Sequence, residues 1–148
     1  MAFKIYRYRT SGTGGTVEAV LDGTEGQNML DNLTIDNFGH IVELEDVGNS
    51  AHNGKVWQYD IKTDSFRIIA KHDPARFGDI GVAATSPFNQ DEETSGVIDV
   101  QSILGPGMYL IVDQAHYTTG IPSGIVEGGQ LLAMFDCPSS SEDVRATA

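Results

Sequence analysis

The chain is 148 residues long, is 40% hydrophobic and carries a formal charge of −12 at pH 7. This composition favours a single globular domain over a disordered chain. With nine Lys and Arg residues in all, nucleic acid is excluded as an expected partner, because phosphate backbones need cationic side chains. The apolar runs are also too short to cross a bilayer as helices, so we expect no membrane partner.

Short apolar runs separated by glycine-rich clusters predict an all-β chain. The first two strands are expected at Ile5–Arg9 and Val17–Leu21, joined by a Ser-Gly-Thr-Gly-Gly loop. Residues 1–9 are too polar for a signal peptide and have the character of the middle of a strand. We therefore expect the chain to be a segment of a larger protein.

Residues 31–46 predict a β-hairpin. Apolar and polar residues alternate from Leu33, and a tight turn is expected around Gly39. The second strand of the hairpin ends in two carboxylates, Glu45 and Asp46. Such hairpins deliver acidic side chains to the central channel in many β-propellers.

Two internal repeats point to the same architecture. A strand pair is expected at 56–60 and 66–70, and its first residues, Val56-Trp57-Gln58-Tyr59, match Ile5-Tyr6-Arg7-Tyr8, 51 residues earlier. Gly39–Asp46 likewise matches Gly107–Gln114, 68 residues later, with an inserted loop at 71–94 accounting for the longer spacing. A period of about 50 residues is typical of propeller blades.

The predicted fold is an all-β partial β-propeller of about two and a half four-stranded blades. It consists of an outer strand pair (5–21), one full blade (31–70), the loop and most of another blade (95–135), within a domain at 1–135. A polar tail at 136–148 is expected to be disordered. Propellers need about four to eight blades, so the missing blades or self-association are expected to complete the ring.

Four carboxylates are candidate metal ligands because each lies at a strand end or just before a strand. They are Glu93, Glu45, Asp31 and Asp113. Calcium takes about six to eight oxygen ligands, so several carboxylates must converge on it. Each residue alone also fits a solvated turn or edge carboxylate, and Asp31 also fits a turn cap.

His116 is a candidate phosphate contact, metal ligand or general acid, because it follows Asp113 by three residues near an expected strand end. A surface-loop histidine is the competing interpretation. The other histidines show no ligand-like spacing, and no Ser-His-Asp arrangement is recognisable. Cys137 is the only cysteine, so the chain has no internal disulfide, and its position in a Cys-Pro-Ser-Ser-Ser segment argues against a catalytic thiol.

Five motifs together resemble the C-terminal part of PhoX-type alkaline phosphatases and their uncharacterised relatives, over about residues 29–135. They are Asp31-Asn32-Leu33, Glu45-Asp46, Glu93-Thr94-Ser95-Gly96, Asp113-Gln114-Ala115-His116 and Glu127-Gly128-Gly129-Gln130-Leu131-Leu132. The order and spacing of the motifs carry the resemblance, since each motif alone is common.

The resemblance implies a six-bladed propeller, usually exported to the periplasm or outside the cell. It implies hydrolysis of phosphate monoesters at a central cluster of calcium and iron. Glu93 matches the Glu of the family's Glu-x-Thr/Ser-Gly motif, which supplies a metal-bound carboxylate, and Asp31 and Glu45 fall where the family places acidic groups near the channel. The family's cysteine ligand to iron has no counterpart, because Cys137 does not match it.

Two functions remain open from the sequence. The first is the C-terminal segment of a calcium-dependent, PhoX-like phosphatase that is inactive without its other blades. The second is a non-catalytic propeller fragment that binds calcium or a partner. A remnant without activity is a third interpretation.

Overall fold

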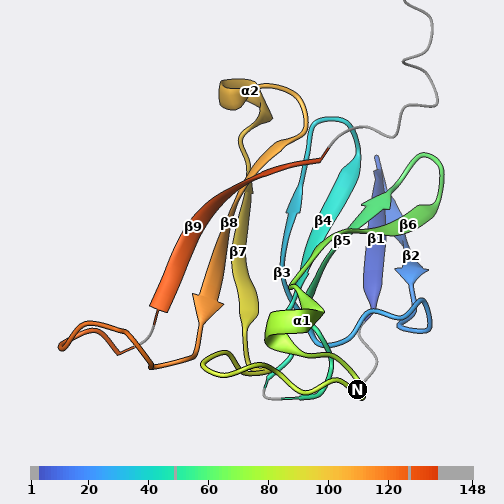
Figure 1. Cartoon of the computed structure of the whole chain (residues 1–148). Helices are drawn as coiled ribbons and strands as arrows, with labels where there is room; N and C mark the ends of the chain where they lie inside the picture. Colours follow the sequence, from blue (N-terminus) through green and yellow to red (C-terminus); the bar gives the residue numbers. More distant parts are fainter. Residues whose placement is uncertain (1–3, 49, 127, 137–148) are drawn as a thin grey trace, which may run out of the picture.

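The computed structural model describes residues 4–48, 50–126 and 128–136. Its nine strands form three antiparallel sheets, β1-β2, β3-β4-β5-β6 and β7-β8-β9, which confirms the predicted all-β class (Figure 1). The strands are β1 (Ile5–Ser11), β2 (Gly14–Leu21), β3 (Leu30–Ile35), β4 (His40–Glu45), β5 (Lys55–Asp60), β6 (Ser65–Lys71), β7 (Glu93–Asp99), β8 (Met108–Ala115) and β9 (Gly128–Phe135). Two one-turn helices, α1 (Pro74–Phe77) and α2 (Gln101–Leu104), lie in the connections. Among the described residues, none of the helices is long and apolar enough to span a membrane.

The β3–β4 hairpin forms where the sequence predicts it. Gly39 takes a φ of 94°, which favours glycine, and the Asp36 side chain accepts hydrogen bonds from the backbone N–H groups of Phe38 (2.9 Å) and His40 (2.8 Å). These bonds close the turn locally. The hairpin therefore needs no distant partner to set its register, which pairs Ile35 with Ile41.

The four-stranded sheet is the middle layer of the molecule. One apolar cluster joins it to the β1–β2 hairpin through Leu21, Ile41 and Tyr59. A second cluster joins it to the β7–β9 sheet and comprises Val42, Leu44, Val56, Val97, Tyr109 and Ile111. Successive side chains of β4 point to opposite faces of the sheet, so the strand contributes to both clusters. Ile41, Glu43 and Glu45 face the hairpin, and Val42 and Leu44 face β7–β9. Burial on both faces makes β4 the centre of the core.

One of the two internal matches falls on strands that hold the same position in their sheets. Gly39–Asp46 and Gly107–Gln114 lie on β4 and β8, each the second strand of its sheet. The other match pairs β1 with β5, and in both cases an antiparallel strand follows directly.

The 71–94 segment and the chain end differ in detail from the predictions. The segment contains α1, and β7 begins at Glu93, so Glu93 lies on a strand rather than before one. Asp136, expected in a disordered tail, forms an ion pair of 2.6 Å with Arg67. The remainder of the predicted tail, 137–148, lies outside the described residues.

Candidate functional site

Three of the predicted ligands gather at one end of the stack of sheets. Glu45 ends β4, Glu93 begins β7, and Asp113 lies near the end of β8. Because β4 lies against β7, acidic side chains from two sheets meet there. We call this region the carboxylate end and define it by Asp46, Glu92, Glu93 and Asp113.

Glu45 is fully buried and its two oxygens accept four hydrogen bonds. Oε1 accepts from the Asn28 backbone N–H (2.8 Å) and from Trp57 Nε1 (2.8 Å). Oε2 accepts from the Lys55 backbone N–H (3.0 Å) and lies 2.8 Å from His52 Nε2. These partners satisfy the carboxylate within the protein, so its geometry suits a structural anchor for β5 and the loop before β3 better than a calcium ligand.

Glu93 lies near Asp46, the neighbour of the predicted ligand Glu45. Burial first, and then a hydrogen bond with the Asp46 carboxyl group, raise the pKa of Glu93 to about 7. Two negative charges that approach each other in a partly dry site repel, and this favours the protonated form of Glu93. A divalent cation relieves the same repulsion without the proton.

Asp113 and His116 have other partners at the carboxylate end. Asp113 Oδ1 lies 2.9 Å from His72 Nε2, a contact that joins β8 to the residue after β6. The His116 backbone N–H donates to Glu92 Oε2 (3.0 Å), and its ring Nδ1 lies 3.1 Å from Asp91. Glu92 is almost fully buried, its Oε1 meets no donor among the described residues, and burial raises its pKa.

Asp31 does not join this group. It is an exposed residue of β3 whose carboxylate accepts a hydrogen bond from its neighbour Asn32, and it borders a separate cavity with Glu43. Across 4–48, 50–126 and 128–136, no set of three His, Cys, Asp or Glu side chains converges in a geometry ready to hold a metal ion. The candidate metal position therefore consists of a carboxylate pair, Glu93 and Asp46.

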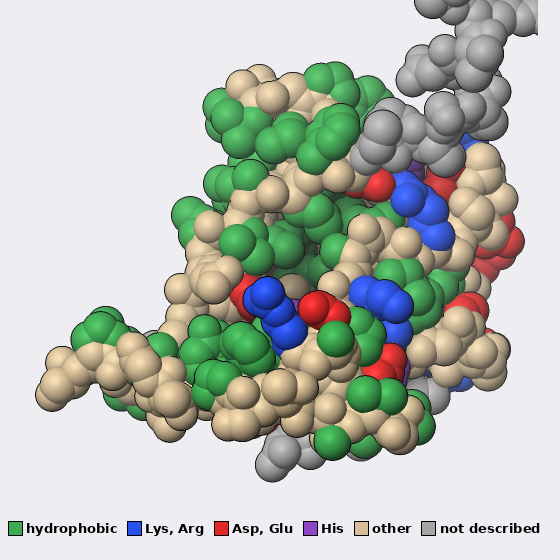
Figure 2. Space-filling view, in the orientation of Figure 1, with side chains coloured by type: hydrophobic (Ala, Val, Ile, Leu, Met, Phe, Trp, Pro, Cys, Tyr) green, Lys and Arg blue, Asp and Glu red, His purple; other side chains and the backbone are tan. Residues whose placement is uncertain are grey.

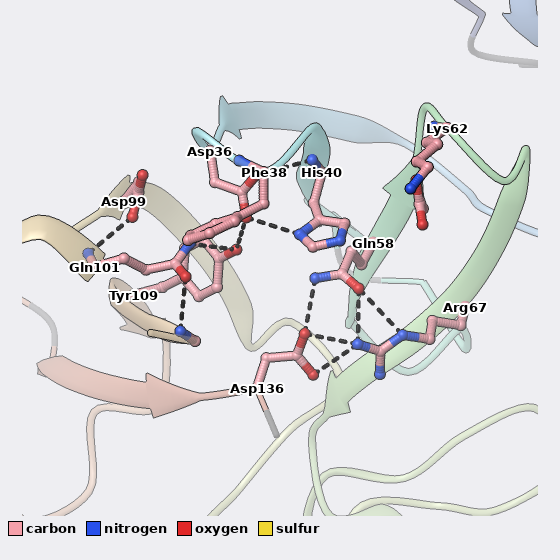
Figure 3. Close-up of polar contacts among 12 residues, drawn as sticks. Asp36, Phe38, His40, Gln58, Lys62, Arg67, Asp99, Gln101, Tyr109 and Asp136 are labelled. Carbon is pink, nitrogen blue, oxygen red and sulfur yellow. Dashed lines mark hydrogen bonds and ion pairs between the residues drawn. The ribbon is translucent and has the colours of Figure 1, made fainter. Parts of the chain in front are cut away.

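The other end of the sheets contains a cavity of about 340 Å³ between the second and third sheets, and the sequence analysis did not select its residues. Asp36 does not line this cavity but contacts three residues that do, His40, Gln101 and Tyr109 (Figure 3). Asp36 Oδ2 accepts from Tyr109 OH (2.8 Å) and Gln101 Nε2 (3.0 Å) and lies 2.8 Å from His40 Nδ1. Burial raises the pKa of Asp36, but hydrogen bonds from His40, Tyr109 and Gln101 outweigh it and lower the pKa to about 2.

A second group crosses the same cavity. Arg67 Nη2 donates to both Asp136 oxygens (2.8 and 2.6 Å), and Gln58 Nε2 also donates to Asp136 (2.7 Å) (Figure 3). The ionised Asp36 fixes His40 with Nδ1 toward it. These contacts link residues that are 65 to 78 positions apart in the sequence, and they hold the two sheets together. The simplest explanation of the network is therefore a structural role.

No family model, curated protein or solved structure matches the chain.

Proposed function

We propose that the chain is part of a β-propeller and that Glu93 and Asp46 bind a divalent cation, calcium by preference, in a PhoX-like phosphatase that hydrolyses phosphate monoesters. The Glu93–Asp46 contact between two adjacent sheets is the observation that carries the metal part of this proposal.

The stacking of the sheets supports the propeller. The sheets have two, four and three strands, they pack face to face, and β3, the first strand of the middle sheet, lies against β7, the first strand of the next. Successive propeller blades pack in this way, with their first strands nearest the axis. In this arrangement β1–β2 are the third and fourth strands of one blade, and β7–β9 are the first three of another.

The outer face of the β7–β9 sheet supports the same arrangement. Ile98, Val112 and Leu131 are 57%, 40% and 70% exposed on it. Figure 2 shows hydrophobic side chains along β9 and around α2. β9 is an edge strand that carries no charged residue, although charges are the usual protection of a free edge. Such a face and edge suit contact with a further strand and a further blade.

The charge of the protein supports the cation. A phosphate ester is an anion, and a chain with a formal charge of −12 repels it unless bound cations reverse the local field. Carboxylate oxygens are the ligands that calcium prefers, and Glu93 and Asp46 would supply at least two of them once Glu93 is ionised. When bound, the cation polarises the phosphoryl group.

The chain's own residues would hold and surround this cation. Glu93 and Asp46 bind it from two sheets, while Asp113, held by His72, adds negative charge nearby. His116 lies close enough to Glu93 to influence its pKa and is the proposed phosphate contact. The family's cysteine ligand to iron has no matching position in the sequence, so we propose no iron site on this chain.

Thermal unfolding in EDTA and in millimolar calcium tests the cation site. A ligand that binds only the folded state raises the unfolding midpoint, so we expect calcium to stabilise the native chain and the Glu93→Gln variant much less. Glu18→Gln is the matched control, because Glu18 is an exposed residue on β2 that pairs with Arg7. Equal calcium-induced shifts of the unfolding midpoint in Glu93→Gln and Glu18→Gln would refute the assignment of Glu93 as a calcium ligand.

A non-catalytic calcium-binding propeller is the second candidate, because no three His, Cys, Asp or Glu side chains of the described residues form a ready metal site. Titration with inorganic phosphate separates the two functions. A phosphatase site binds phosphate only when calcium is bound and loses this binding in His116→Ala. Calcium binding without any calcium-dependent phosphate binding favours the second candidate.

A further inference from the structure

Glu43 is a buried carboxyl group without a hydrogen-bond donor. It lies in the middle of β4, is 1% exposed, and neither of its oxygens meets a donor in the described part of the chain. The buried Gln27 Oε1 lacks a donor as well, and both residues lie near Glu25, which accepts a hydrogen bond from Gln27 Nε2 (3.0 Å). Gln27 Oε1 and at least one Glu43 oxygen are acceptors in either protonation state of Glu43, so the missing group is a donor.

A cavity of about 150 Å³ leads to Glu43. It lies between the start of β1, at Lys4 and Ile5, and the first half of β3, including Asp31 and Leu33. The Lys4 ammonium group borders this cavity but forms no ion pair with Glu43 within 4.0 Å. The opening therefore presents two carboxylates, one buried and one exposed, to whatever occupies it.

The face of β3 and β4 around the cavity is only half covered. The hairpin β1–β2 covers its outer half, where Leu21 packs on Ile41 and Tyr59. On the inner half, Leu33 and Ile35 stay 53% and 58% exposed, although their cross-strand partners, Glu43 and Ile41, are buried. Exposed apolar residues beside an unsatisfied acid mark a surface that another element covers.

We propose that this half-covered face binds a β-strand that pairs with the free edge of β1, packs on Leu33 and Ile35, and brings a Lys or Arg side chain to Glu43. The inference rests on the propeller part of the proposed function and not on its cation site. The occupant is one of the first two strands of the blade to which β1–β2 belong.

Three observations select this occupant. β1 and β2 match the third and fourth strands of the middle sheet, so the inner half of their own blade is the part that the hairpin does not supply. Among the strands of the described residues, none pairs with one edge of β1, and the start of β1 lies beside β3 at the cavity. A second copy of the chain is disfavoured, because each copy carries a formal charge of −12.

The chemistry of such a contact divides between backbone and side chain. Main-chain hydrogen bonds to the edge of β1 would give affinity to any extended segment, while the pocket at Glu43 would select the side chain that enters it. A cationic donor would both satisfy the acid and lower its pKa, so that Glu43 ionises in the buried site. Specificity for Lys or Arg is therefore expected at one position of the strand and for apolar residues at its neighbours on the same face.

A peptide selection tests this proposal. A phage-displayed library of random ten-residue peptides is selected on the full chain, and individual peptides are then measured by titration against the native chain, Glu43→Gln and Glu18→Gln. We expect alternating apolar peptides with one conserved Lys or Arg, bound at least ten-fold more weakly by Glu43→Gln and unchanged by Glu18→Gln. Hydrogen exchange should show new protection of β1 amides in the complex.

The other outcomes overturn the proposal in distinguishable ways. Peptides without a basic residue, or equal binding to Glu43→Gln, would refute the role of Glu43, and no enrichment at all would refute the docking surface. Dimers of the chain that Glu43→Gln dissociates would make a second copy the occupant. Loss of stability in both Lys4→Ala and Glu43→Gln would identify Lys4 as the partner of Glu43. Each result leaves the calcium titration as a separate test of the cation site.

Discussion

The Glu43→Gln substitution should stabilise the isolated chain, and by an amount that depends on pH. Burial, with a smaller contribution from Glu25, raises the pKa of Glu43 from 4.5 to about 8. The folded state therefore keeps the proton after the unfolded chain has lost it. Stability from this group is fully present below pH 4.5 and is lost as the pH rises through 8.

The magnitude follows from the two pKa values. Each pKa unit corresponds to about 1.4 kcal/mol, so ionisation of the unfolded chain at pH 7 costs the folded state about 3 kcal/mol, rising to about 5 kcal/mol above pH 8. Glutamine has nearly the same shape, supplies the missing donor and does not titrate. We expect native and variant chains to be nearly equal at pH 4.5 and to diverge as the pH rises.

Urea unfolding at several pH values between 4.5 and 8.5 measures this difference directly. Taking the difference between native and variant cancels the titration of all other groups, provided that they are independent of Glu43. Glu18→Gln should change stability by no more than about 1 kcal/mol at neutral pH, because its pair with Arg7 is exposed. A difference between Glu43→Gln and the native chain that does not vary with pH would refute the reasoning.

Two further substitutions test the buried carboxylates that do have partners. Asp36→Asn should cost about 2 kcal/mol at pH 7, because hydrogen bonds lower the pKa of Asp36 from 3.8 to about 2, and this cost should disappear as the pH falls through 2. Urea unfolding at pH 7 and pH 2.5 checks this, and an unchanged cost at the lower pH would contradict it. Glu45→Gln should cost about 3 kcal/mol at pH 7, since four donors lose a charged acceptor. A loss under 1 kcal/mol in the same assay would mean that these contacts contribute little.

The strand pairs of the middle sheet were predictable from the sequence because their signals are local. Alternation and a turn glycine are enough to form β3 and β4, and Asp36 closes the turn within four residues. The match between Gly39–Asp46 and Gly107–Gln114 also identified equivalent strands, since both begin after a turn glycine and run into the core.

The choice between Glu45 and Asp46 was not predictable in the same way. Neighbouring residues on a strand point to opposite faces, so the metal candidate depends on which face of β4 meets β7. Val42 and Leu44 face the β7–β9 sheet, and Asp46 continues their row to Glu93. Glu45 continues the other row, towards Trp57 and His52. The sequence contains both rows but does not say which sheet covers each.

The hydrogen-bond network around Asp36, at the opposite end of the sheets, was not predictable either, because its members are far apart in the sequence. Asp36 and His40 are neighbours across a tight turn, but Gln101 and Tyr109 are separated from Asp36 by 65 and 73 residues. Nothing local marks those partners before the third sheet packs on the second. His40 consequently looked like an ordinary turn histidine, although a buried, ionised carboxylate fixes its ring.

The acidic residues on and beside β4 fall into two groups, those whose oxygens have hydrogen-bond donors within the chain and those whose oxygens do not. The second group marks the places where a binding partner is missing. Four donors of the chain itself satisfy the Glu45 carboxylate, so its burial requires no external partner. Asp46, which follows β4, lies near Glu93, whose pKa is raised, and Glu43 on the other face has no donor among the described residues. We propose a cation for the first case and a basic side chain for the second, because converging negative charges attract a cation whereas a buried carboxyl group without a partner lacks a donor. If both interpretations hold, calcium and a basic peptide should stabilise the chain additively, and strong coupling between them would show that the two faces of β4 do not act independently.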